Sequence, residues 1–310
     1  MKKNSRILII GHNDSVDNSL CSYFSKGKYT NVFSNQQSKL NVLDQVQVVK
    51  FFKKEKPEYI FLGSIRSGGI VANQEHPAEF IYENIMAQSN VIHQAYLHQA
   101  KKLLYFTGSC AYPKEAKQPI KESSLLTGEL EESSEAYSVA KIAGVKLCQA
   151  YRAQYGFNAI SAVPATLYGP GSDANLETAH VMGALIGKFC KAVKNQDAQV
   201  VVWGTGKPRR EFLYVDDFVS ACGVLMDTYE GADLMNMGVG YDVTIKELAA
   251  AVARLSGFKG KILFDTTKPD GTMRKLMDNT RITKLGWKPK IGLEEGIKKT
   301  IEHYNKRNAS

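Results

Sequence analysis

Two runs of residues carry side chains that could do chemistry. In the first, Tyr137 and Lys141 stand four positions apart. On a helix this pair shares one face, so the ammonium would lower the pKa of the phenol and let it pass a proton to or from a sugar hydroxyl or ketone. The second run, residues 203–212, places cations in a glycine-rich loop, which suits a pyrophosphate. Together the two runs predict chemistry on a nucleotide-linked sugar.

Short apolar strands alternating with amphipathic helices would position these side chains. We expect strands at residues 6–11, 29–34, 59–63, 102–109 and 159–164, and helices at residues 16–26, 44–54, 77–100 and 136–155. This alternation is typical of an α/β fold with a doubly wound parallel sheet. The pair of Tyr137 and Lys141 would lie on the last of these helices.

The pattern becomes less regular after residues 169–171. We therefore expect a Rossmann-like nucleotide-binding domain over residues 1–170 and a mainly substrate-binding lobe over residues 171–310. A helix near residues 181–194 belongs to this smaller lobe. A strand at residues 234–237 is expected to return to the main sheet.

Composition narrows the class of protein. The chain has 310 residues, 44% of them hydrophobic, and a net charge of +9. No apolar run approaches a membrane span, so we expect a soluble, cytoplasmic protein with no membrane partner. No nucleic-acid motif accompanies the positive charge, which is either a solvated basic surface or an attraction for anionic small molecules. The five cysteines are scattered and lack CxxC spacing, which argues against a disulfide framework or a metal site.

The ordered set of motifs resembles the GDP-L-fucose synthase family, within the extended short-chain dehydrogenase/reductases. The matching segments are residues 68–73, 80–84, 109–113, 137–147, 167–170, 202–217 and 268–272. The resemblance implies a homodimer formed through the helix of Tyr137 and its neighbour. It also implies an enzyme that takes a GDP-linked 4-keto-6-deoxy sugar, epimerises C3 and C5, and reduces C4 with NADPH.

The resemblance assigns roles to individual residues. Cys110 and His180 would be the base and acid of epimerisation. Tyr137 would donate the proton in the reduction, while Lys141 would tune it and hold the nicotinamide ribose. The GDP-sugar would be bound by Lys188, Trp203, Arg210 and Lys275, with the lysine at 188 in place of an arginine. The alternatives are that Cys110 is a small buried hydrophobe and that His180 is a surface or capping histidine.

The first loop departs from the Gly-x-x-Gly-x-x-Gly pattern of the family. Gly11 remains, but Asp14 and Asp17 stand where the other glycines would be, and Asn13 and Gln37 stand where arginines would bind the 2′-phosphate of NADPH. Each aspartate adds bulk and places negative charge at a helix N-terminus that would otherwise attract phosphate. We therefore expect NADP(H) to bind weakly or not at all. The alternative is that the aspartates cap the helix.

The active-site serine of the family is also missing, because its position is Gly108. Side chains alternate along a strand, so Ser109 could replace it only if the strand end twists or bulges. Two hypotheses stay open. The first is an enzyme acting on a GDP-4-keto sugar, for which epimerisation alone is as plausible as epimerisation with reduction. The second is a pseudoenzyme that binds a GDP-sugar or an active paralogue without chemistry.

Overall fold

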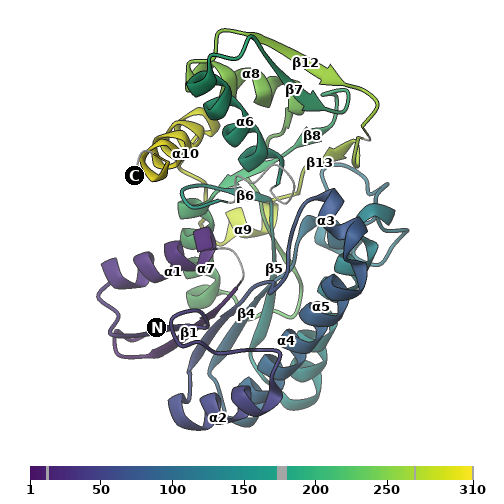
Figure 1. Ribbon diagram of the computed structural model, residues 1–310. Helices are drawn as coiled ribbons and strands as arrows, with labels where there is room; N and C mark the ends of the chain where they lie inside the picture. Colours follow the sequence, from purple (N-terminus) through teal and green to yellow (C-terminus); the bar gives the residue numbers. More distant parts are fainter. Residues whose placement is uncertain (12–13, 173–179, 269, 309–310) are drawn as a thin grey trace.

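A parallel sheet forms the centre of the protein in the computed structural model, which describes residues 1–11, 14–172, 180–268 and 270–308 (Figure 1). Its six strands are ordered β10-β5-β4-β3-β1-β2, and every neighbouring pair is parallel. The strands are β1 (Arg6–Ile10), β2 (Asn31–Ser34), β3 (Tyr59–Leu62), β4 (Lys102–Phe106), β5 (Ala159–Pro164) and β10 (Met235–Met237). Pairing of β10 with β5 confirms the predicted return of the late strand to the main sheet.

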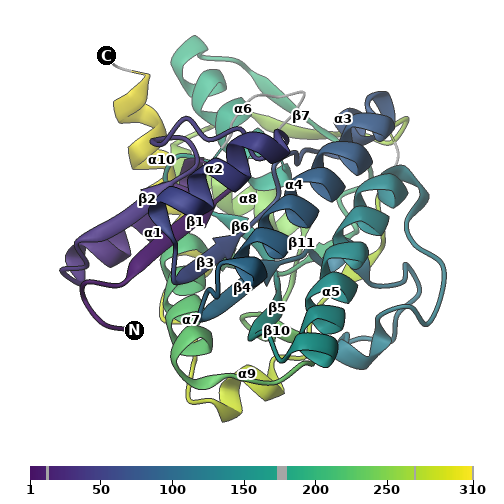
Figure 2. The same ribbon diagram turned by 90° about the horizontal axis from the view of Figure 1, so that it is seen from below.

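Helices cover both faces of this sheet (Figures 1 and 2). One face carries α1 (Asp14–Lys26) packed against α7 (Val215–Thr228). The other carries α2 (Gln45–Glu55), α4 (Pro77–Leu97) and α5 (Glu135–Tyr155), with α4 and α5 side by side. The doubly wound α/β fold predicted from the alternation is therefore confirmed.

Local signals explain where several of these elements begin and end. Asp44 precedes α2 and its carboxylate accepts hydrogen bonds from the backbone amides of Val46 and Gln47, so it is a cap rather than the first helical residue. Gly156 ends α5 in the left-handed conformation at φ 67°. The strand expected at residues 102–109 is shorter, because β4 stops at Phe106 and a 3-10 turn, η1 (Ser109–Ala111), follows.

A smaller lobe stands over the carboxyl ends of the strands, at the top of Figure 1. It is built from α6 (Val181–Asn195), α8 (Ile245–Ser256), α10 (Leu293–Arg307), the parallel pair β7 (Gln199–Trp203) and β12 (Lys261–Asp265), and a small sheet of β11 (Val243–Thr244), β8 (Arg209–Arg210) and β13 (Arg274–Lys275). A hydrophobic cluster separate from the one around the main sheet holds α6, α8 and α10 together. The predicted helix near residues 181–194 is α6.

Shorter elements connect the two parts. They are α3 (Ile70–Glu75), η2 (Glu122–Ser124), η3 (Glu132–Ser134), the pair β6 (Thr166–Tyr168) and β9 (Phe212–Tyr214), and α9 (Thr280–Lys284). Across the described part of the chain, none of the helices has the length and apolarity needed to span a bilayer.

Candidate active site

A cavity of about 510 Å³ lies where the carboxyl ends of the strands meet the smaller lobe. Parallel sheets bind ligands at this edge, because the loops after neighbouring strands converge there. Eight of the nine residues predicted from the sequence line the cavity: Gly11, Cys110, Tyr137, His180, Lys188, Trp203, Arg210 and Lys275. The ninth, Lys141, is buried next to the wall. The structure thus brings the predicted residues together, while their individual roles stay predictions.

Tyr137 lies near the start of α5 and reaches across to the end of β3. Its Oη is 2.7 Å from Oγ of Ser64, and its ring meets that of Phe80 edge-on. Burial and the nearby Cys110 raise the pKa of Tyr137, and the hydrogen bond to Ser64 opposes this rise. The expectation that Lys141 lowers the pKa of this phenol is therefore wrong for the protein as it stands, because burial outweighs any nearby charge.

Lys141 is 1% exposed, one helical turn beyond Tyr137 on α5. Its Nζ lies 4.3 Å from the centre of the Tyr105 ring and has no hydrogen-bond partner among the described residues. Burial lowers the pKa of Lys141 to about 7, although the thiols of Cys110 and Cys148 act in the opposite direction. A buried amine without a partner is costly. This Nζ therefore fits a hydroxyl-bearing ligand, as the ribose of a nicotinamide cofactor would be.

The residues that follow β4 correct an argument made from the sequence. Because β4 ends at Phe106 and η1 begins at Ser109, the alternation of an extended strand does not continue through Ser109. Thr107, Gly108, Ser109 and Cys110 all line the cavity. A bulge is thus not needed to bring Ser109 to the site.

The start of α1 shows what replaced the glycines of the first loop. Asp17 is 3% exposed and its Oδ1 lies directly over Gly11, so that a Cβ added to that glycine would collide with it. Nε2 of Gln36 donates to the other carboxylate oxygen at 3.4 Å, and the Asn35 amide bonds both backbone groups of Gly11. Asp17 is the fourth residue of α1 and therefore lies beyond the N-cap position itself.

The remaining positions of the loop are less informative. Gln37 is exposed just beyond β2. Asn13 lies outside the described residues, as does the side chain of Asp14.

Trp203 also lines the cavity, and this residue is 48% exposed. Nζ of Lys188 lies 5.3 Å from the ring centre and donates to the carbonyl of Val201, and burial lowers the pKa of this lysine. Nζ of Lys268 lies 5.5 Å from the same ring. An exposed indole with two ammonium groups near its ring can bind a nucleotide, because the ring can stack on the planar base and the ammonium groups attract the phosphates.

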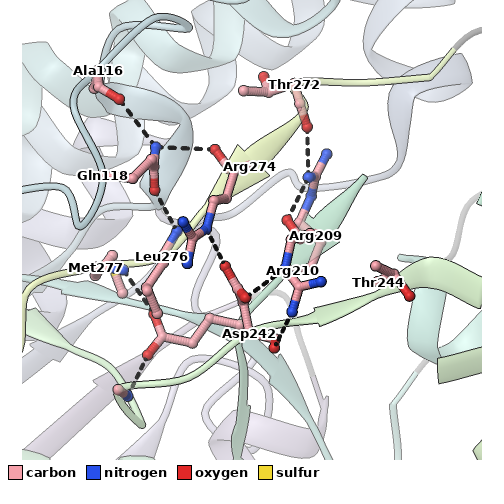
Figure 3. Close-up of polar contacts among 12 residues, drawn as sticks. Ala116, Gln118, Arg209, Arg210, Asp242, Thr244, Thr272, Arg274, Leu276 and Met277 are labelled. Atoms are coloured by element: carbon pink, nitrogen blue, oxygen red, sulfur yellow. Dashed lines mark hydrogen bonds and ion pairs between the residues drawn. The ribbon is translucent and has the colours of Figure 1, made fainter. Parts of the chain in front are cut away.

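Arg210 and Lys275 are paired on neighbouring strands β8 and β13. Nη1 of Arg210 donates to the carbonyls of Arg209 and Thr272, at 2.8 and 2.6 Å (Figure 3). Burial lowers the pKa of both Arg210 and Lys275. Glu131 opposes this effect on Arg210, and Cys110 opposes it on Lys275 more strongly than Glu131 does. Two partly desolvated cations side by side favour an anionic ligand.

A carboxylate holds these strands in place. Asp242 accepts hydrogen bonds from Nε of Arg209 at 2.7 Å and from Nε of Arg274 at 2.5 Å (Figure 3). Burial opposes ionisation of Asp242, but the hydrogen bonds from Arg274 and Arg209 hold its pKa below the usual range. Gln118 also holds β13, because its Nε2 donates to the carbonyl of Arg274 and its Oε1 accepts from the backbone amide of Leu276. The strands therefore present the two cations rigidly.

Comparison with known proteins identifies the family. Residues 7–238 match the model of the NAD dependent epimerase/dehydratase family. The chain is 48% identical over 304 residues to a putative GDP-L-fucose synthase 2 from Arabidopsis thaliana, which covers 98% of this chain and 93% of that protein. The chain belongs to the GDP-L-fucose synthase branch of this family.

Solved structures of two GDP-heptose reductases share the whole fold. A GDP-6-OMe-4-keto-L-xylo-heptose reductase from C. jejuni is 36% identical, with a TM-score of 0.93 and 99% of each chain covered. A GDP-mannoheptose C4 reductase from Campylobacter jejuni, solved with NADP bound, is 38% identical, with a TM-score of 0.89 and coverage of 98% of this chain and 99% of that one.

Two cavity residues were missed by the sequence analysis. Ser64 contacts Tyr137, and Glu131 lies near Arg210 and Lys275 while accepting a hydrogen bond from Thr272 at 2.9 Å. Neither belongs to a motif with a regular spacing. A serine directly after an apolar strand was the one available signal for Ser64, since strand ends converge in this fold. Within the described ranges, His, Cys, Asp and Glu side chains form no group that could hold a metal ion.

Proposed function

We propose that the protein is a GDP-sugar epimerase/reductase that acts on a GDP-linked 4-keto-6-deoxy sugar with NADP(H). One observation carries this proposal. A proton-transfer group, Tyr137, and a thiol, Cys110, line one cavity, and the amine of Lys141 is buried nearby. An exposed indole and paired cations line the same cavity. The first part suits a ketone and the second suits a nucleoside diphosphate. Names of relatives that act on GDP-sugars support the same substrate class.

Epimerisation needs a base and an acid next to the ketone. The C4 carbonyl acidifies the protons at C3 and C5, so a modest base removes one as an enolate forms. We assign this step to Cys110, with His180 returning a proton from the other side of the ring. Both residues line the cavity, and Cys110 follows β4 close to Tyr137. No redox cofactor takes part in this exchange.

Reduction needs a proton for the carbonyl oxygen. When bound, NADPH supplies the hydride to C4. Tyr137 gives its phenolic proton to the oxygen and becomes a phenolate, while Lys141, with its unpartnered Nζ, holds the cofactor ribose. The relative solved with NADP bound supports the choice of cofactor. The expected weakening of binding stays a prediction that rests on Asp17; the comparisons give it no support.

The pseudoenzyme alternative is less well supported. A protein without chemistry would have no use for a phenol, a thiol and a buried amine close together, yet Tyr137 and Cys110 line one cavity and Cys110 lies near enough to act on the pKa of Lys141. The comparisons likewise give no support to an inactive protein.

We also propose that the protein is a cytoplasmic homodimer that pairs through α4 and α5. The exposed face of these helices carries large apolar side chains: Tyr82 is 62% exposed and Val139 is 40% exposed. Met86 and Leu147 are half-buried and follow them at helical spacing. An apolar face of this kind on adjacent helices suits a second copy of the same face.

Exchange with solvent tests the enzyme. In heavy water, with GDP-4-keto-6-deoxy-mannose and no nicotinamide, we expect deuterium at C3 or C5 by mass spectrometry. Cys110→Ser and His180→Asn should each suppress the exchange. Tyr137→Phe should affect it less and should instead abolish the NADPH-dependent product. If the wild type exchanges no deuterium with or without NADPH, the protein is not an epimerase.

A further inference from the structure

Ser64 places a hydroxyl against the phenol of Tyr137. Ser64 follows β3, and its Oγ is 2.7 Å from Oη of Tyr137, a residue 73 positions later in the chain. Both side chains line the cavity. Tyr137 is the group that must lose a proton in the proposed reduction, so a hydroxyl at this distance bears directly on it.

The same chain lacks the hydroxyl that its family uses. Gly108 stands at the serine position, and it also lines the cavity. Two other hydroxyls lie close by, on Thr107 and Ser109. Oγ1 of Thr107 is buried without a hydrogen-bond partner among the described residues, and neither hydroxyl is bonded to Tyr137. Ser64 is thus the serine that the geometry joins to the phenol.

We propose that Ser64 replaces the serine missing at position 108, as the positioning residue that orients Tyr137 and stabilises its phenolate. The inference rests on the proposed function, because it assigns a partner to the proton donor of that reaction.

The physical reason lies in what proton transfer leaves behind. When Tyr137 gives its proton to the carbonyl oxygen, a negative charge forms on a phenol oxygen in a largely buried place. An O–H donor aimed at that oxygen stabilises the charged form. The contact with Ser64 acts in this direction, since it lowers the pKa of Tyr137 against the effect of burial. A donor fixed in advance contributes most, because it need not reorganise as the charge develops.

Position 108 still has room for the hydroxyl it lacks. The glycine has an ordinary extended backbone, with φ −138° and ψ 161°. A Cβ added there would meet Sγ of Cys110 at 3.4 Å, an ordinary van der Waals distance. Gly108→Ser should therefore fold without strain, which makes a rescue experiment possible.

Steady-state reduction of GDP-4-keto-6-deoxy-mannose with NADPH tests the assignment. Ser64→Ala should lower kcat by about 10- to 100-fold, as expected for loss of one such hydrogen bond, with little change in KM. Ser64→Thr keeps the hydroxyl and should stay close to the wild type. The matched control Ser123→Ala, at an exposed serine of η2 outside the cavity, should leave kcat unchanged. Gly108→Ser added to Ser64→Ala should restore much of the lost kcat.

A second measurement needs no turnover. With 3-fluorotyrosine incorporated, the ¹⁹F resonance of position 137 is assigned by its loss in Tyr137→Phe. This resonance should move in Ser64→Ala and stay in place in Ser123→Ala. If the wild type reduces nothing while the resonance moves as described, the proposed function fails and the contact stands. The inference is overturned if Ser64→Ala leaves both kcat and the resonance unchanged, or if Gly108→Ser restores none of the loss.

Discussion

At Lys141 the chain buries an amine that its own described side chains do not satisfy. Its pKa falls from an ordinary 10.5 to about 7, chiefly through burial. Between these two values the unfolded chain holds the proton and the folded chain does not. The unfolded state binds more protons in that window, so this group makes the free energy of unfolding rise with pH from about 7 to 10.5. Below pH 7 the fold must bury the charge and is least stable.

Lys141→Met should therefore stabilise the protein in the absence of cofactor. Methionine keeps the length and unbranched shape of the side chain without the charge. We expect the free energy of unfolding to rise by a few kcal/mol at pH 6, and the gain to shrink towards pH 10. Urea titrations of both proteins across this range measure the difference.

Lys146→Met is the control for this change. Lys146 lies on the same helix with its side chain exposed, so its replacement should leave the pH dependence of the difference near zero. A gain for Lys141→Met that is equal at pH 6 and pH 10 would show that packing, and not the buried charge, is its cause.

At the scale of elements, we expect the start of α1 to affect the affinity for NADPH. The carboxylate of Asp17 lies over Gly11, where the family pattern leaves the backbone open. Two like charges about 5 Å apart cost roughly 3 kcal/mol at an effective dielectric near 20, which corresponds to about 100-fold in affinity. Asp17→Asn, which removes the charge and keeps the size, should tighten NADPH binding by about 10- to 100-fold, and Asp17→Gly should tighten it further.

Isothermal titration with NADPH measures this effect. Asp197→Asn removes a carboxylate from an exposed loop of the smaller lobe and should leave the dissociation constant unchanged. If Asp17→Asn binds as the wild type does while Asp17→Gly binds more tightly, bulk rather than charge weakens the site. An unchanged dissociation constant in both variants would show that Asp17 does not affect the affinity for NADPH.

Sequence reasoning worked where a signal is local and failed where packing intervenes. The helix of Tyr137 and Lys141 and the strand at Ala159–Pro164 were predicted to within a residue, because periodicity and a terminal glycine define them. The pKa of Tyr137 was predicted in the wrong direction, because spacing along a helix does not show how deeply its face is buried. Ser64 was missed because only the sheet brings it to a residue 73 positions away.

At the scale of the whole molecule, the site is shared between two cores. The part built around the main sheet supplies Tyr137 from α5 and Cys110 from η1, and the small sheet of the lobe supplies Arg210 and Lys275. The domain boundary that we place near residue 170 remains a prediction. Both α7 and β10 follow this boundary in the chain, yet they pack on the main sheet. We therefore expect the part around the main sheet and the smaller lobe to bind the same ligand from two sides of the cavity.

The face of α4 and α5 leads to a prediction about assembly. If two copies pair there, Tyr82 and Val139 are buried against the partner, and a charge at either position would be desolvated without a counter-ion. The double change Tyr82→Glu and Val139→Glu should convert a dimer into a monomer by light scattering after gel filtration. Val201→Glu is the control, because that side chain is 40% exposed on the smaller lobe. A wild type that elutes as a monomer at micromolar concentration, or a double variant that stays dimeric, would rule out this face as the interface.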